Sequence, residues 1–191
     1  MHAQWLDGEP ITGLLAMGGV LDRYRRLVVG GRPVATGVAL VGDSWACTNP
    51  SAGRGLSVGL AHAQLLRDCV GETLHDPVAF AERWDELTEE KVAPFYRNQI
   101  ASDRIRLAQM RAIGDGLEPP RDDTPQARLA AASMHDPDLF RCLLETVQCL
   151  ALPQEVLGRP GLAEKIESLQ DAEVSPLPGP DRQQLLQLLV A

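Results

Sequence analysis

The order of hydrophobic and polar positions divides the chain into a short strand-like region and a longer helical region. Within residues 20–29 the spacing by two of Leu21, Arg23, Arg25 and Leu27, with Tyr24 and Arg26 between them, indicates a β-strand. Gly30-Gly31 follows as a turn signal that would direct the chain towards Val38. Residues 38–41 form a short apolar run, Val-Ala-Leu-Val, which predicts a strand buried on both faces and ending before Gly42.

Helical spacing begins after Gly55, where apolar residues recur on one side of a predicted helix. A second helix should start at Asp76-Pro77, because an aspartate can cap the first turn and a proline fits the first helical position. Its large apolar residues also share one face. Pro94 should kink or split this helix, since it removes an interior hydrogen bond. The two apolar faces consist of Leu56, Leu60 and Ala63, then Leu66 or Cys69 and Val70, in the first helix and of Phe80, Trp84 and Leu87 in the second.

The rest of the chain also has helical patterning. Glycines within residues 114–116 should end the preceding helix, and residues 118–125 have the composition of a linker. The cap-then-proline signal recurs at residues 124–125 and 136–137. A last helix should begin at Asp181, and its apolar cluster needs a surface to cover, in this chain or on a partner. The cluster is Leu185, Leu186, Leu188, Leu189 and Val190.

Composition and charge exclude several classes of function. The net charge of −8 over 191 residues argues against a nucleic-acid partner, which a basic patch would attract, and 4% aromatic residues offer little surface for base stacking. The four cysteines lack the close paired spacing of a zinc site or a disulfide framework. No apolar run approaches the roughly 18 residues of a membrane span, and a signal sequence is not recognised at the start, so we expect a cytoplasmic protein.

Residues 38–63 are the stretch whose residue types indicate chemistry rather than packing alone. Asp43 follows the predicted strand, where its carboxylate could accept hydrogen bonds from hydroxyl groups of a ligand. The first N–H groups of the helix after Gly55 favour an anion or a carbonyl oxygen. Gly53, Gly55 and Gly59 would let a ligand approach the backbone closely. A P-loop is disfavoured because its Gly-Lys-Ser/Thr ending is missing. These features suit a large polyhydroxylated ligand with an electron-rich ring edge.

The same stretch resembles the second FAD-binding motif of the flavoprotein monooxygenases similar to p-hydroxybenzoate hydroxylase. That motif reads Gly-Asp-Ala-Ala-His, a short spacer, and Pro-x-x-Gly-x-Gly-x-Asn-x-Gly-x-x-Asp-Ala. The matching residues are Gly42, Asp43, Pro50, Gly53, Gly55, Gly59 and Ala63. The resemblance implies that Asp43 binds the ribityl chain of FAD. It also implies that the loop from Pro50 and the backbone of residues 53–57 lie against the isoalloxazine ring near N1 and C2=O. This part of the predicted site comprises Gly53, Arg54, Gly55, Leu56 and Ser57.

The sequence departs from the motif at three positions. Ala46 replaces the histidine, Ser57 replaces the asparagine and His62 replaces the late aspartate. The resemblance implies a bacterial-type, monooxygenase-like FAD-dependent oxidoreductase, whose substrate and electron donor the sequence does not identify. The alternative is a non-catalytic helical interaction protein, or a truncated flavoprotein, that retains a degenerate flavin motif.

The Gly-x-Gly-x-x-Gly turn that would hold the ADP pyrophosphate does not occur in the sequence. We therefore expect the C-terminal part of a flavoprotein that binds FAD weakly or not at all by itself, and that relies on an N-terminal half or a partner subunit. The predicted fold is an α/β fragment, mainly α, with a remnant strand–loop–helix of a Rossmann-like fold. Its parts are a partial FAD-binding region at 1–75, a helical segment at 76–117, a linker at 118–125 and a helical region at 126–191.

Overall fold

The structure is a computed structural model that describes residues 9, 11–16, 21–170, 172, 180 and 182–190. It is mainly helical, as predicted, with a few two-residue strands. The chain forms two compact units, Met1–Val92 and Ala93–Ala191, here called unit 1 and unit 2. The expected start at Asp181 lies outside the described residues. None of the described helices is long and apolar enough to cross a membrane.

Unit 1 contains four short strands that form two antiparallel pairs. The strands are β1 (Arg23–Tyr24), β2 (Val28–Val29), β3 (Arg32–Pro33) and β4 (Ala46–Cys47). β1 pairs with β4, and β2 pairs with β3. Gly30 and Gly31 connect β2 to β3 with φ angles of 58° and 74°, the positive values that a tight two-residue hairpin requires. The predicted turn is therefore confirmed, although the alternating segment before it forms two short strands instead of one.

The prediction of a strand at residues 38–41 is wrong. These residues lie outside the helices and strands, and a short 3-10 helix, η2 (Gly42–Ser44), follows them. Val41 has the extended angles of a strand, φ −133° and ψ 142°. A strand is defined by hydrogen bonds to a neighbour, however, and no described strand pairs with this segment. Its apolar residues Ala39 and Val41 pack instead against the helical core of unit 1.

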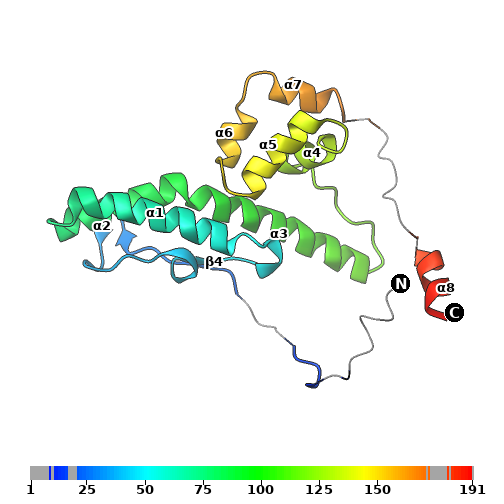
Figure 1. Cartoon of the computed structure of the whole chain (residues 1–191), viewed down its shortest axis with the longest axis horizontal. Coiled ribbons are helices and arrows are strands. Elements are labelled where there is room, and N and C mark those ends of the chain that lie inside the picture. Colours follow the sequence, from blue (N-terminus) through cyan, green and yellow to red (C-terminus); the bar gives the residue numbers. More distant parts are fainter. Residues whose placement is uncertain are drawn as a thin grey trace. The chain divides into compact units, whose positions relative to one another are not determined.

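The core of unit 1 lies between two helices, α1 (Gly55–Thr73) and α2 (Pro77–Lys91). Figure 1 shows the two helices side by side, with the short strands along the pair. Asp76 caps α2 by accepting hydrogen bonds from the N–H groups of Val78 and Ala79, both at 3.0 Å. The predicted apolar face of α2 is confirmed, because it packs in the core. The predicted face of α1 is wrong in its first two turns, where Leu56, Leu60 and Ala63 are exposed, and only its later residues reach the core. The buried residues of this core are Cys69, Phe80 and Trp84, with Leu65, Leu66, Val70 and Leu87 packed against them.

Unit 2 consists of helices, and most of their predicted boundaries are confirmed. α2 ends at Lys91 and a new helix begins at Ala93, so the helix splits next to Pro94 as expected. Thr124 and Asp136 cap the helices that follow them, each with proline in the first turn. The helices are α3 (Ala93–Gly114), α4 (Pro125–Ala132), α5 (Pro137–Val147), α6 (Pro153–Leu157), α7 (Leu162–Glu167) and α8 (Arg182–Val190). Their core is formed by Leu129, Ala132, Leu139, Val156, Leu162 and Ile166.

Candidate functional site

Three residues of the flavin-like motif, Gly42, Gly59 and His62, form a packed half that lies inside unit 1. Gly42 has a φ angle of 56°, and its N–H donates a hydrogen bond to Nδ1 of His62 at 3.3 Å. A Cβ atom on Gly42 would lie 3.6 Å from the Cα atom of Gly59. The loop and α1 therefore meet backbone to backbone at this pair of glycines. In this half of the motif glycine serves a left-handed conformation and close packing within the protein.

His62 is the residue on which this packing converges. Its side chain is fully buried, stacks on Trp84 with ring centroids 4.5 Å apart, and meets the edge of Trp45 at 5.1 Å. Nε2 lies 3.0 Å from Oγ1 of Thr88. Because Nδ1 accepts the Gly42 N–H, the neutral ring carries its proton on Nε2 and donates to Thr88. His62 thus joins the motif loop, α1 and α2.

The environment of His62 keeps the imidazole neutral. Burial disfavours the charged form and lowers the pKa of His62 to about 4. A histidine that is enclosed by two tryptophans and hydrogen-bonded on both ring nitrogens has no face left for a substrate. The replacement of the motif's late aspartate by His62 is therefore structural, a role that the sequence interpretation missed. The sequence around His62 carries no local signal of this role, because only the fold brings His62 together with Trp45 and Trp84.

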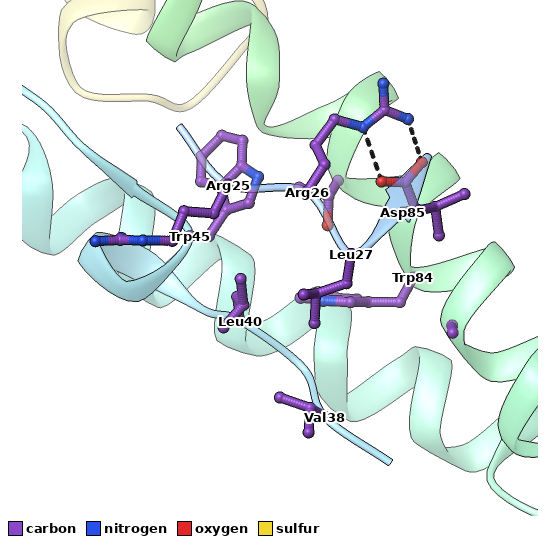
Figure 2. A pocket seen from close by; sticks show the side chains of 11 residues that line it. Arg25, Arg26, Leu27, Val38, Leu40, Trp45, Trp84 and Asp85 are labelled. Carbon is purple, nitrogen blue, oxygen red and sulfur yellow. Dashed lines mark hydrogen bonds and ion pairs between the residues drawn. The ribbon is translucent and has the colours of Figure 1, made fainter. Parts of the chain in front are cut away.

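Arg25 and Arg26, between β1 and β2, bind neighbouring parts of unit 1. Arg25 donates to the carbonyl oxygens of Ser44 at 2.9 Å and Asp43 at 3.3 Å. Arg26 forms a paired salt bridge with Asp85, whose Oδ1 accepts from Nε at 3.0 Å (Figure 2). This hydrogen bond raises the pKa of Arg26. Arg25 therefore supports the motif loop, whereas Arg26 ties the segment between β1 and β2 to α2.

The cavity between these arginines and the core is small. Its volume is about 20 Å³, close to the space that one water molecule needs. Figure 2 shows its lining, which includes Arg26, Leu27, Trp45 and Trp84. A flavin ring cannot enter a space of this size. The candidate ring-binding surface is therefore the open side of the motif.

Asp43 and residues 50–57 form the open half of the motif. Asp43 is exposed in η2, and its Oδ1 atom lies 3.8 Å from the position that a Cβ on Gly55 would take. The carboxylate therefore stands beside the start of α1. A second 3-10 helix, η3 (Pro50–Ala52), leads from there to Gly53, which has a φ angle of 66°. Pro50, Gly53, Gly55, Leu56 and Ser57 are exposed, whereas Arg54 is half-buried.

The start of α1 lacks the side-chain cap that α2, α4 and α5 have. Arg54 stands at its N-cap position, and no side chain there accepts a hydrogen bond from the first turn, which also lacks an acidic residue. By contrast, Asp76, Thr124 and Asp136 cap α2, α4 and α5. The first-turn N–H groups of α1 and the positive end of its dipole are thus presented at an exposed surface.

These residues fit one end of FAD. An exposed carboxylate can accept hydrogen bonds from ribityl hydroxyls, and a helix start without a side-chain cap can donate to an electron-rich ring edge. The absence of side chains at Gly53 and Gly55 leaves the backbone open to a flat ring. No group of histidine, cysteine, aspartate and glutamate residues suited to a metal ion occurs in the part of the chain that the structure describes. Of the predicted site residues, Gly42 is packed against Gly59, and the others lie along the exposed loop and the start of α1.

Comparison of the chain with protein-family models, with curated proteins and with solved structures finds no match to any of them.

Proposed function

We propose that unit 1 contributes the ribityl- and ring-binding part of an FAD-dependent oxidoreductase of monooxygenase-like type. The observation that carries this proposal is the pairing of an exposed carboxylate, Asp43, with the uncapped and exposed start of α1 at Gly55. The resemblance of residues 38–63 to the second FAD motif supports the same assignment. The packed His62 contributes rigidity rather than chemistry.

Each part of the open surface has a task in this proposal. The carboxylate of Asp43 accepts hydrogen bonds from the ribityl chain, and the backbone from Gly53 to Ser57 faces the N1 and C2=O edge of the ring. The positive end of α1 stabilises negative charge on that edge by roughly 0.3–1 kcal/mol when exposed and up to about 2 kcal/mol when partly buried. Bound FAD supplies hydride or electron transfer to a substrate or to dioxygen. The side chains named here bind and orient the cofactor.

The adenine end of FAD needs groups that an N-terminal half or a partner subunit would supply. Residues 38–40 offer a place for such a half to join, because no described strand pairs with them, whereas the N–H and C=O groups of Val41 are already hydrogen-bonded to Ser44. An added strand there would turn the strand–loop–helix arrangement into part of a Rossmann-like sheet. FAD should therefore bind weakly to this chain alone, and the purified chain should lack a stoichiometric flavin absorbance. A yellow one-to-one complex would contradict this expectation.

Riboflavin is the sharpest probe of the proposal, because it has the ribityl chain and ring but no ADP. In a titration followed by amide chemical shifts, riboflavin should perturb the signals of residues 53–57. Asp43→Ala should weaken riboflavin binding by about tenfold or more, since hydrogen bonds to a charged group contribute about 1.5–3 kcal/mol. The same substitution should leave the binding of lumiflavin, which has no ribityl chain, unchanged.

The control variant is Asp115→Ala, which removes an exposed carboxylate from the turn after α3. It should bind riboflavin like the unsubstituted chain. Equal weakening of riboflavin and lumiflavin by Asp43→Ala would contradict the ribityl assignment, and shifts confined to other surfaces would contradict the site itself.

The second candidate is a non-catalytic helical interaction protein with a degenerate flavin motif. Its support comes from the replaced motif positions, because Ala46 is buried in β4 and His62 is a core residue. This function predicts no specific shift of residues 53–57 with riboflavin or lumiflavin. The titration therefore separates the two candidates.

A further inference from the structure

Unit 2 has an open groove beside its hydrophobic core. Its volume is about 390 Å³, and its walls come from α4, α6 and α7. The floor is apolar, formed by Pro125, Leu157, Ala163 and Ile166, and the rim carries Arg128 and Glu167, which have opposite charges. Ile166 belongs to the core of unit 2 and Leu157 packs against it. The groove is therefore an incomplete edge of the core, open to an apolar occupant.

α8 is a helix whose apolar side is uncovered. Leu185, Leu186 and Leu188 are 49%, 51% and 68% exposed. At 100° per residue, Leu185 and Leu186 fall on the side of the helix away from Gln184 and Gln187, whereas Leu188 borders Gln184, so α8 has an apolar side. It has nine residues, whereas isolated helices shorter than about 12–15 residues are marginal in water. A stable α8 therefore needs a surface to pack against.

The connection between groove and helix is short. Gln170 lines the groove, and α8 begins at Arg182, so residues 171–181 form the tether. Eleven residues can span at most roughly 36–40 Å. α4, one wall of the groove, has eight residues and is about 12 Å long at 1.5 Å per residue. The tether can thus reach any part of the groove, and a short tether gives an effective concentration of roughly millimolar.

We propose that α8 docks into this groove of its own chain, with its leucine side against Leu157, Ala163 and Ile166. An amphipathic helix in an apolar groove is a common recognition mode, and here it would cover both the leucines and the open edge of the core. The tether makes the same chain the favoured occupant over a second copy. The mixed charges of the rim are unsuited to a small ligand that bears a single sign of charge.

Hydrogen exchange of the full chain, measured by mass spectrometry, tests this docking. Amides of residues 182–190 should exchange at least about tenfold more slowly than those of an unstructured peptide. Ala163→Glu should abolish this protection, because it puts a charged side chain on the groove floor at an exposed position that the fold tolerates. The matched control is Ala108→Glu, an exposed alanine on α3 outside the groove lining, which should leave the protection intact.

A second pair of variants tests the helix. Leu185→Gln should reduce the protection of α8, whereas Gln187→Glu, on the polar side, should preserve it. Light scattering after size-exclusion chromatography should show a monomer at concentrations where α8 is protected. Unprotected α8 amides, or protection that survives Ala163→Glu, would overturn the proposal. Protection that disappears on dilution together with a dimer would assign the groove to a second copy and overturn it as well.

Discussion

The two halves of the flavin-like motif use the same residue type for opposite purposes. In the packed half, Gly42 and Gly59 bring the loop onto α1, and His62 closes the contact beneath Trp84. In the open half, Gly53 and Gly55 face outwards, with no protein atom that a new methyl group would displace. A glycine-rich motif is therefore partly a packing device and partly an accessible surface. Only the open half has a surface available to a ligand.

Removing Trp84 should be the most damaging change to the packed half. Its ring is 6% exposed, stacks on His62 and belongs to the core of unit 1. Trp84→Ala should lower the free energy of unfolding of unit 1 by about 3–5 kcal/mol. Leu60→Ala, at a position that is 63% exposed, should change it by less than about 0.5 kcal/mol.

Urea unfolding followed by tryptophan fluorescence makes this comparison, since all three tryptophans of the chain lie within residues 1–92. Trp45 remains as a reporter in the Trp84→Ala variant. A similar midpoint shift for Trp84→Ala and Leu60→Ala would show that the packed half does not depend on the aromatic stack.

Acid should weaken the packed half through His62. The pKa of His62 is about 4 in the folded protein, below the ordinary value of 6.5, so the unfolded chain binds this proton more tightly. The contribution of neutral His62 to the free energy of unfolding of unit 1 is complete above pH 6.5. It is lost as the pH falls towards 4, by at most about 3 kcal/mol. Urea midpoints from tryptophan fluorescence between pH 4 and 7 measure this loss for unit 1.

The control for this pH dependence is His62→Gln, which removes the titrating group. The variant should be less stable at pH 7, and its stability should fall less steeply between pH 6.5 and 4. An unchanged slope would show that other groups cause the acid sensitivity of unit 1.

Helix starts were predictable because their signals are local. At Asp76 and Asp136 a carboxylate accepts N–H groups only two and three residues ahead, and proline in the first turn reinforces the boundary. The split next to Pro94 follows equally from local chemistry. In each case the physical cause lies within one turn of the residue that signals it.

Features that depend on distant partners were not predictable in the same way. Residues 38–41 have a strand-like composition, but a strand also needs a neighbour, and no described strand supplies one. His62 acquires its role from Trp45, 17 residues before it, and from Trp84 and Thr88, 22 and 26 residues after it. The motif alone could not separate the glycines that pack within the protein from those that stay open. Flavin binding itself stays a prediction.

The smallest expected change in stability gives the sharpest test of the two halves. Gly55→Ala adds a methyl group at the start of α1 that would lie 3.8 Å from Asp43, an ordinary contact, and its φ angle is not positive. Unit 1 should therefore unfold within about 0.5 kcal/mol of the unsubstituted chain. The added methyl group should nevertheless weaken riboflavin binding, because it stands where the flat ring would approach the backbone.

Gly42→Ala is the opposite case: its left-handed conformation makes alanine cost about 1–2 kcal/mol of stability. At temperatures where this variant remains folded, its riboflavin affinity should be unchanged. Fluorescence-detected unfolding and the riboflavin titration, applied to both variants, should show opposite patterns. If Gly55→Ala leaves riboflavin binding intact, the open half of the motif does not contact a flavin.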